Sequence, residues 1–427
     1  MSIKINERLL KNNLKKWLKR PEIIVIVGPR QAGKTFFVKN LLPGITSREV
    51  KYFNFESLDL RELWQNNPNN FLKNIIEEKE PIYVFDEFQK VPDLASRLKV
   101  LYDEDKQNFP KIILTGSSLP EIKDKVSQSL VGQAVVFNML TLSFREKYFL
   151  PEIDFLQKTF DEPEKIDIKS IEKKTFLQKK EIKSKLLEYL LEGGYPELGE
   201  FKKEQRSEKL KSIIQLVLER DLQQLVKSEH LFSSKKLLEM LSFQIGNLVS
   251  FENMASEMQL NNKTIRRLVA ILEGLFLIKL VYPKSSSAHE YKKAPKIYFH
   301  DLGFRNELIK VRQLPLESAM MGGLVENFIF NQLSRYGNYK NDFKINYWQN
   351  YNKNEVDFIL SRGEKLVSIE VKYRRGQKSR LTKGIISFIQ RYKPQCHIVA
   401  TFDYFHKTKV DDCPVYFIPV YAFGFII

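Results

Sequence analysis

The most constraining feature of this chain is a glycine-rich loop that directly follows a short apolar run, Ile23–Val27. The loop matches the pattern G-x-x-x-x-G-K-[ST] at every required position and consists of Gly28, Pro29, Arg30, Gln31, Ala32, Gly33, Lys34 and Thr35. Backbone N–H groups of such a loop surround a polyphosphate, while the lysine reaches the β and γ phosphates and the threonine hydroxyl coordinates Mg²⁺. A helix over residues 34–42 would add the positive end of its dipole. The sequence therefore predicts an ATP and Mg²⁺ site between a strand and a helix.

A second apolar run, Ile82–Phe85, ends in two acidic residues that would complete this site. Asp86 is predicted to hold Mg²⁺ through water, and Glu87 to polarise the water that attacks the γ-phosphate. A solvated turn is the alternative for two acids after an apolar run, but the glycine-rich loop upstream favours the catalytic interpretation. A hydroxyl beside the γ-phosphate is expected from Ser117 or Ser118, which end a further apolar run.

The amino-terminal third alternates apolar runs with segments of helical pattern. Further strands are predicted at residues 50–55, 111–115 and 134–138, and helices at residues 70–80 and 94–102. This alternation indicates an α/β fold over residues 1–149, a P-loop NTPase parallel sheet with helices on both faces. The strand at 50–55 is interpreted as an extra strand inserted between the phosphate-loop strand and the Asp86 strand. Such an insertion is typical of ATPases with a catalytic glutamate.

Several motifs, taken in their order along the chain, resemble a known family. They are Gly28–Thr35, Phe85–Pro92, Leu114–Ser118, Leu140–Arg145, Gly193–Glu197, Arg220-Asp221, Tyr298–Asp301 and Glu355–Phe358. With these motifs the chain resembles the prokaryotic AAA-superfamily ATPases that carry a carboxy-terminal domain of unknown function. The resemblance runs over nearly the whole chain and implies an ATPase followed by further domains.

One position departs from the pattern of that family. The family usually has an arginine in the segment that matches Leu130–Gln133, where this chain has Gln133. An arginine there would neutralise charge in the transition state, which is worth orders of magnitude in rate. The resemblance therefore implies slow hydrolysis, or an arginine supplied by Arg145 or by another subunit of a homo-oligomer.

Composition limits the class of protein. A chain of 427 residues predicts two or three domains. No apolar run reaches the roughly 18 residues of a membrane-spanning helix, so no membrane contact is expected. Cys396 and Cys413 form no paired-cysteine motif, which favours the reducing cytoplasm. The net charge of +17 favours a nucleic-acid partner, although lysine enrichment from AT-biased coding explains it equally well.

The middle of the chain changes character twice. Residues 150–184 are charged with little apolar periodicity and are interpreted as a linker or insertion, partly helical at most. Residues 185–290 are predicted to be a helical winged-helix domain, with helices at 251–258 and 262–275 and a strand at 277–282. If Asn262 caps the second helix, its early turns carry the side chains that would read a DNA groove, Lys263, Arg266 and Arg267. A packing module between the flanking domains is the alternative.

The last region, residues 291–427, contains a second pattern with chemical meaning. Two consecutive predicted strands, Glu355–Leu360 and Leu366–Lys372, carry the D…E-x-K arrangement of restriction-endonuclease-like, or PD-(D/E)xK-like, α/β folds. The catalytic candidates are Glu326 on a preceding helix, Asp357, Glu370 and Lys372. Asp357 and Glu370 would bind Mg²⁺, and Lys372 would orient or deprotonate the attacking water. An exposed acid–lysine pair on a strand is the alternative interpretation.

Together these patterns predict a three-part cytoplasmic protein with ATP and Mg²⁺ as cofactors. The expected function is Mg²⁺-dependent ATP hydrolysis that controls DNA contacts of the winged-helix and nuclease-like domains. One alternative is an ATP-regulated DNA endonuclease. The other is a nucleotide-switched scaffold for protein interactions, in which the positive charge only keeps the protein dissolved.

Overall fold

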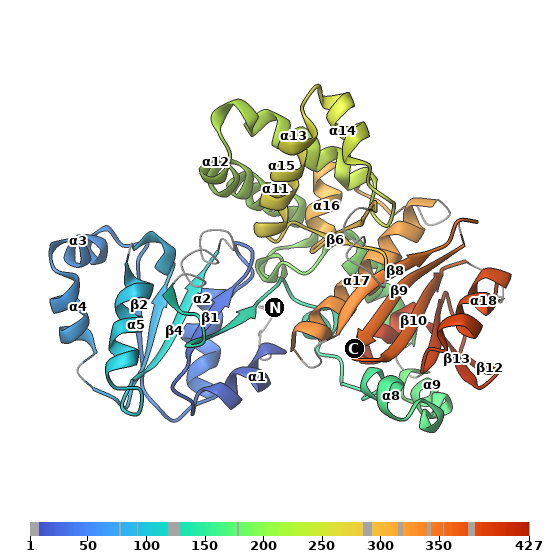
Figure 1. The fold of residues 1–427 in the computed structure, drawn as a ribbon, viewed down its shortest axis with the longest axis horizontal. Coiled ribbons are helices and arrows are strands. Elements are labelled where there is room, and N and C mark those ends of the chain that lie inside the picture. Colours follow the sequence, from blue (N-terminus) through green and yellow to red (C-terminus); the bar gives the residue numbers. More distant parts are fainter. Residues whose placement is uncertain are drawn as a thin grey trace.

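The computed structural model describes residues 8–76, 78–91, 93–117, 129–176, 179–284, 293–314, 319–339, 343–352, 354–374 and 381–426. Three parts are visible in Figure 1. An amino-terminal α/β unit and a carboxy-terminal α/β unit lie on opposite sides, and a helical middle region lies above the junction between them.

The amino-terminal unit is built on a parallel sheet. Its strands are β1 (Ile23–Val27), β2 (Val50–Asn54), β3 (Ile82–Asp86), β4 (Lys111–Gly116) and β5 (Ala134–Asn138). They lie in the order β2-β3-β4-β1-β5, and each neighbouring pair is parallel. β1 is fully buried, as expected for a parallel strand covered on both faces. The predicted parallel α/β sheet is therefore confirmed.

The order of the strands corrects one expectation. β4, rather than β2, lies between the phosphate-loop strand β1 and the Asp86 strand β3, and β2 forms the sheet edge. The segment at 50–55 does form a strand. In the sequence it lies between β1 and β3, but in the sheet it does not. Crossover connections through helices separate sequence order from spatial order in a parallel sheet.

Helices cover both faces of this sheet because alternate residues of β1 point to opposite sides. Ile24 and Ile26 pack with the amino-terminal helix α1 (Leu10–Trp17) and with the helix that follows the loop. Val25 and Val27 pack on the other side, in a core shared with three helices. These are α3 (Leu58–Asn66), α4 (Pro68–Ile75) and α5 (Leu94–Glu104).

The structure differs from the linker predicted over residues 150–184. Its described residues form α8 (Leu156–Asp161), a 3-10 turn, α9 (Ile168–Phe176) and the start of α10 (Lys179–Glu192). In Figure 1, α8 and α9 lie below the terminal unit. Phe155 and Phe160 belong to the same buried core as the terminal sheet, and Asp161 pairs with Arg362. Helices this short have no long apolar period, so the sequence pattern did not reveal their burial.

The middle region is helical and ends in a small antiparallel sheet. Its elements are α10, α11 (Lys203–Leu216), the π-helical turn η6 (Val217–Asp221), α12 (Leu222–Leu225), α13 (Ser228–Phe243), α14 (Phe251–Met258), α15 (Asn262–Gly274), β6 (Ile278–Val281) and β7 (Lys296–Phe299). The side chain of Asn261 accepts a hydrogen bond from the backbone of Thr264, so Asn261 rather than Asn262 caps α15. An asparagine one residue earlier satisfies the first free N–H groups equally well, which the sequence pattern does not resolve.

The terminal unit is a six-stranded mixed sheet in the order β12-β13-β11-β10-β9-β8. Its strands are β8 (Lys344–Gln349), β9 (Glu355–Arg362), β10 (Lys365–Lys372), β11 (Cys396–Thr401), β12 (His406–Val410) and β13 (Cys413–Pro419). Its helices are α17 (Ala319–Tyr339), α18 (Lys383–Tyr392) and α19 (Phe423–Ile426), whereas α16 (Leu302–Leu308) packs mainly against α10, α11 and α13 of the middle region. β9 and β10 form the predicted pair and are antiparallel. Among the described residues, no helix combines the length and apolar character needed to span a bilayer.

Candidate functional site

A cavity of about 400 Å³ opens at the carboxyl ends of β1, β2 and β3, beside the phosphate loop. Ligands of open parallel sheets bind at this edge. Its walls are Arg30, Gln31, Gly33, Lys34, Thr35, Phe36, Asn54, Glu56, Asp86, Glu87, Pro196, Glu197 and Glu200. The last three belong to the middle region, so two parts of the chain form the cavity.

The glycine-rich loop places a buried cation beside this cavity. Gly33 has a φ of 91°, which glycine adopts without strain, and it precedes α2 (Lys34–Phe36). The Lys34 ammonium donates to the carbonyl oxygens of Gly28 and Pro29, each at 2.8 Å. Burial lowers the pKa of Lys34 to about 8, although the negative charges of Glu87 and Asp86 raise it. Phosphate oxygens would compete with the two carbonyls for this ammonium.

Hydroxyl groups gather around the buried carboxylate of Asp86. Thr35 Oγ1 donates to Asp86 Oδ2 at 2.8 Å, Tyr52 donates to the same oxygen at 2.5 Å, and Thr115 donates to Oδ1. Burial and the hydrogen bond to Asp86 raise the pKa of Tyr52, so its hydroxyl stays a donor. The Thr35 hydroxyl and the Asp86 carboxylate are hard oxygen ligands and fit Mg²⁺.

Glu87 lies directly after β3 in a left-handed backbone conformation, with a φ of 53°. Its Oε2 accepts hydrogen bonds from Ser117 Oγ at 3.1 Å and from the amide of Gln89. The structure thus brings Glu87 and Ser117 together at the cavity. Ser118 lies outside the described residues.

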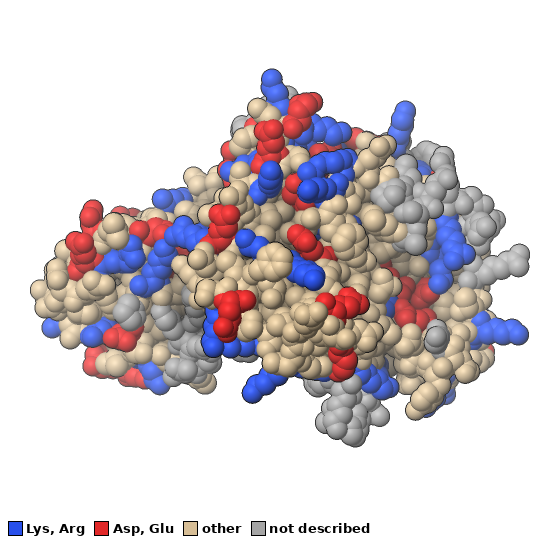
Figure 2. Space-filling model, turned by 90° about the horizontal axis from the view of Figure 1, so that it is seen from above, with Lys and Arg blue, Asp and Glu red and all other residues tan. Residues whose placement is uncertain are grey.

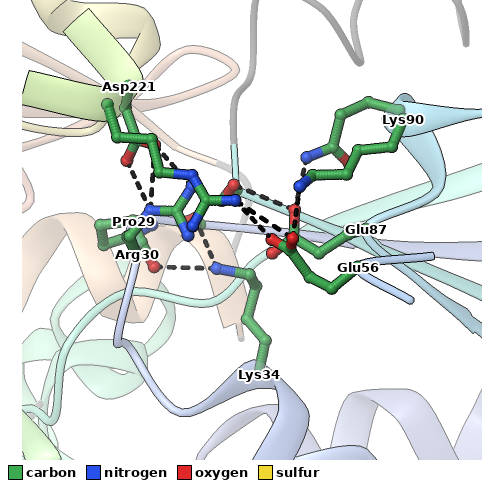
Figure 3. A network of polar contacts seen from close by, with 11 residues as sticks. Pro29, Arg30, Lys34, Glu56, Glu87, Lys90 and Asp221 are labelled. Carbon is green, nitrogen blue, oxygen red and sulfur yellow. Dashed lines mark hydrogen bonds and ion pairs between the residues drawn. The ribbon is translucent and has the colours of Figure 1, made fainter. Parts of the chain in front are cut away.

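Two arginines link this cavity to the middle region (Figure 3). Arg30 Nε lies 2.9 Å from both carboxylate oxygens of Asp221, and its Nη2 lies 2.6 Å from Oδ1. Arg220 Nη2 lies 3.2 and 3.1 Å from the two carboxylate oxygens of Glu56, which also pairs with Lys90. Burial lowers the pKa of Arg30, but its hydrogen bond to Asp221 and the charges of Asp221 and Glu87 outweigh this and raise it. Two-pronged charged hydrogen bonds of this kind fix geometry strongly.

The arginine candidate predicted for the cavity lies elsewhere. Arg145 pairs with Glu152 at 2.6 Å and lines a different pocket, next to Arg8. Gln133 donates to Asp103 of α5 at 2.6 Å. Neither residue lines the cavity beside the phosphate loop.

The four residues of the predicted nuclease-like site lie close together around a lysine that the sequence pattern did not single out. Lys296 of β7 lies 3.0 Å from Glu326 and 3.2 Å from Asp357, and it also pairs with Glu355. Lys372 pairs with Glu370, one of whose oxygens is buried without a hydrogen-bond partner. A positive side chain therefore already lies among these carboxylates.

Burial changes the ionisation of this carboxylate cluster. Burial and the charge of Asp357 raise the pKa of Glu326 to about 7 and that of Glu370 to about 8. Within the described ranges, no group of three or more His, Cys, Asp and Glu side chains is arranged to hold a metal ion. The cluster is thus a mixed network of acids and lysines.

The predicted DNA-contacting residues Lys263, Arg266 and Arg267 are exposed on α15. Arg266 contacts residues of its own helix, α15, and of the preceding helix, α14. It donates to Asn262 at 2.6 Å, lies 3.6 Å from Glu252, and stacks 4.8 Å from the ring of Phe251. On the face in Figure 2, the described basic side chains are interspersed with acidic ones rather than gathered in one tract.

Asp301 links the amino-terminal unit to the middle region, and Arg335 connects this junction to the terminal unit. Its Oδ2 accepts hydrogen bonds from Gly194 N and Thr141 Oγ1, both at 2.9 Å, and its Oδ1 caps α16 through Phe304 N at 3.1 Å. Arg335 of α17 donates to the carbonyl oxygens of Thr141 and His300. The motifs 193–197 and 298–301 therefore form one buried junction.

The glycine-rich loop after β1 and the acidic residues at the end of β3 have the arrangement that P-loop ATPases share. Residues 20–148 match the family model described as "AAA domain". Residues 183–314 and 321–422 match two further family models, each described as a domain of unknown function, DUF8612 and DUF4143.

Relatives in archaea and bacteria align with most of this chain. An uncharacterized protein of Methanocaldococcus jannaschii is 26% identical over 92% of this chain and 83% of its own length. One of Mycobacterium tuberculosis is 24% identical over 84% of this chain and 72% of its own.

Among solved structures, the Aeropyrum pernix ORC1 protein in complex with DNA covers 70% of this chain and 91% of that chain, at 13% identity and a TM-score of 0.29. The Thermotoga maritima RuvB Holliday junction branch migration motor covers 66% of this chain and 91% of that chain, at 11% identity and a TM-score of 0.25.

Sequence reasoning missed several residues of these sites. Arg220, Asp221 and Asp301 stand in motifs that carried the family resemblance, but no role was predicted for them. Glu56 and Lys296 carry no local signal, because each reaches its site only through the tertiary fold.

Proposed function

We propose that this protein binds ATP with Mg²⁺, hydrolyses it, and uses its nucleotide state to control contacts of the middle and terminal regions with DNA. One observation carries this proposal. The cavity beside the phosphate loop is walled by Glu87 and Asp86 on one side and by Pro196 and Glu197 of the middle region on the other. A nucleotide bound in this cavity would therefore contact residues of the middle region directly.

Each side chain has a role in this reaction. Backbone N–H groups of the loop and the Lys34 ammonium bind the β and γ phosphates. Thr35 and Asp86 would hold Mg²⁺, which supplies charge neutralisation to the phosphates when bound. Glu87, oriented by Ser117, aligns a water molecule with the γ-phosphorus and accepts its proton.

The test compares ATP binding and turnover in two variants with matched controls. Lys34→Ala should lose ATP binding, whereas Lys16→Ala, at an exposed lysine of α1, should keep it. Glu87→Gln should retain ATP and lower kcat by roughly 10²- to 10⁴-fold, as expected for loss of a general base. Glu62→Gln, at an exposed acid of α3, should turn over normally.

Fluorescent ATP-analogue titration and phosphate release measure these quantities. Unchanged ATP affinity in Lys34→Ala would contradict the nucleotide site. Normal turnover in Glu87→Gln would remove Glu87 from the mechanism.

Two features support DNA as the partner. The helix pair α14 and α15 is followed by the antiparallel pair β6 and β7, the element order of a winged helix. Basic residues lie exposed on the early turns of α15, which is the groove-reading position of such folds.

The carboxylate cluster supports a second candidate function, an ATP-regulated endonuclease. A helix carrying Glu326 precedes the strand pair that carries Asp357, Glu370 and Lys372, as in restriction-endonuclease-like folds. Metal-dependent cutting at this cluster would require Lys296 to move away from the carboxylates it now pairs with. If Lys296 stays in place, the terminal unit binds partners without cutting them, which is the scaffold alternative.

A further inference from the structure

Phosphoryl transfer places additional negative charge on the γ-phosphate oxygens, and a positive side chain that contacts them accelerates the reaction by orders of magnitude. Lys34 supplies one such charge. The chain has Gln133 where an arginine is expected, and both Gln133 and Arg145 are engaged away from the cavity. The source of a second cation is therefore open.

One arginine lines the nucleotide cavity and a second contacts one of its wall residues. Arg30 belongs to the phosphate loop and is fixed by Asp221. Arg220, the residue before Asp221, extends from η6 of the middle region to Glu56, a wall residue of the cavity. The carboxylate of Glu56 holds its guanidinium. Because 40% of its side chain is exposed, surrounding residues do not enclose it.

The charges around this cavity are close enough to act on one another. Burial has the largest effect on the pKa of Lys34, followed by the charges of Glu87, Asp86, Arg30 and Asp221. Burial raises the pKa of Glu56, but Lys90 and Arg220 outweigh this and lower it. A triphosphate in the cavity would introduce several negative charges among these groups. It would compete with Glu56 for Arg220, because phosphate and carboxylate are both recognised by the guanidinium fork.

We propose that Arg220 is the catalytic arginine of ATP hydrolysis, supplied by the middle region of the same chain, and that its guanidinium passes from Glu56 to the γ-phosphate when ATP binds. The inference rests on the ATPase activity proposed above. It also couples ATP binding to the middle region, because Arg220 belongs to η6 and exchanges Glu56 for the γ-phosphate.

In the reaction, the water oxygen forms a bond to the γ-phosphorus while the bond from that phosphorus to the β–γ bridging oxygen breaks. The bridging oxygen leaves with the electron pair as part of ADP. The water proton passes to Glu87 and then to solvent, and inorganic phosphate remains. Arg220 donates hydrogen bonds to the γ-phosphate oxygens throughout and is itself unchanged.

Asp221 is a positioning residue in this scheme. It holds Arg30 of the phosphate loop by a two-pronged contact, so the neighbouring Arg220 is fixed relative to the bound phosphates. The wide turn η6 presents these consecutive residues to Arg30 and Glu56. Asp221→Asn should lower kcat with little change in ADP affinity, and Asp221→Glu should restore part of the rate.

The first experiment measures turnover and nucleotide binding in the full-length Arg220→Ala variant. We expect kcat to fall roughly 10³-fold or more, the range found for catalytic arginines, while ADP affinity changes by only a few-fold. Tight binding of ADP with aluminium fluoride, a transition-state mimic, should be lost. Arg220→Lys should keep more of the rate than Arg220→Ala, and Lys211→Ala, at an exposed basic residue of α11, should behave as wild type.

The second experiment asks whether the arginine acts within one chain. Lys34→Ala and Arg220→Ala subunits are mixed in equal amounts and the ATPase rate is measured. An arginine from the same chain predicts no recovery, whereas an arginine donated to a neighbouring subunit predicts a recovered rate.

The outcomes separate this inference from the function on which it rests. If the wild type hydrolyses ATP and Lys34→Ala does not, but Arg220→Ala keeps the wild-type kcat, the role of Arg220 is wrong and the ATPase stands. Recovery on mixing overturns the same-chain arrangement. If the wild type neither binds nor hydrolyses ATP, the ATPase itself fails.

Discussion

Single buried residues fix how the three parts of this protein meet. Asp301, Arg305 and Arg335 are almost fully buried, yet each is hydrogen-bonded to groups from distant segments. Removing one partner of such a network leaves a polar group buried and unsatisfied, which costs more than the intact contact contributes. His300 lies in the same junction, and its Nδ1 is buried without a partner.

The stability of the fold should therefore depend on pH through His300. Burial and the charge of Arg335 lower its pKa from 6.5 to about 3, so the unfolded chain binds more protons between these values. The free energy of unfolding should fall as the pH falls from about 6.5 toward 3, by on the order of a few kcal/mol from this residue. Urea unfolding of His300→Gln at pH 7 and pH values near 4.5 measures how much of this loss disappears.

Burial shifts the pKa of His397 in the same direction, so the comparison uses the difference between variant and wild type. His406→Gln, at an exposed position of β12, serves as the control and should follow the wild-type profile. Parallel pH profiles for His300→Gln and wild type would contradict the assignment.

At the scale of elements, close backbone contacts hold the ATPase domain against the middle region. Both backbone polar groups of Gly194 are hydrogen-bonded. Its carbonyl oxygen accepts from Leu142 N at 2.8 Å, and its N–H donates to the Asp301 carboxylate. A Cβ at Gly194 would lie 2.0 Å from the Leu142 carbonyl oxygen, and this neighbour is backbone that cannot swing aside.

Gly194→Ala should therefore destabilise the protein by about 3 kcal/mol or more and lower ATP turnover, because the junction beside the cavity must shift. Gly322→Ala in α17 is the matched control, since nothing lies within 4 Å of a Cβ there. Thermal unfolding and ATPase rate are measured for both. A Gly194→Ala protein with wild-type stability would show that this contact is not rigid.

The local elements with strong patterns were the most predictable ones. The sequence pattern predicted β1, β9, β10 and α14 to within a few residues, because a continuous apolar run or an amphipathic repeat is local information. The residues of 150–184 were misinterpreted because their apolar side chains are buried by a sheet that begins more than a hundred residues later in the chain. The position of β4 likewise depends on crossover connections.

At the scale of the whole molecule, charge and shape bear on the partner. The net charge of +17 is large, but Figure 2 shows basic and acidic side chains mixed over the visible face. Net charge alone favours association with polyanions without defining a site. The proposed DNA contact is therefore tested at the individual basic residues on α15.

If α15 contacts DNA, binding should weaken with salt, and the double variant Arg266→Ala/Arg267→Ala should reduce the salt slope by about two phosphate contacts. Lys235→Ala/Lys236→Ala on α13 is the matched control. Binding is measured by fluorescence anisotropy across salt concentrations, with and without ATP. Equal slopes in both variants would exclude this helix as the contact.

The same samples test the endonuclease candidate on supercoiled plasmid with Mg²⁺. Nicking that requires Asp357 should vanish in Asp357→Ala and increase in Lys296→Met, which removes the ammonium from the carboxylates. Intact plasmid with wild type and with Lys296→Met would leave the cluster a structural ion-pair network.

The glycine-rich loop, the Asp86-Glu87 pair and the alternating α/β order could be predicted from the sequence, because each is encoded in a few neighbouring residues. The sequence also placed Glu326, Asp357, Glu370 and Lys372 as one candidate group. The contacts of Arg220 and Asp221 with two wall residues of the cavity, Glu56 and Arg30, depend on the tertiary fold. So do the place of Lys296 among the carboxylates and the junction that Asp301 and Arg335 form between the three parts. These contacts connect segments that are separated in the sequence, and packing of whole elements, rather than local pattern, sets which side chains meet.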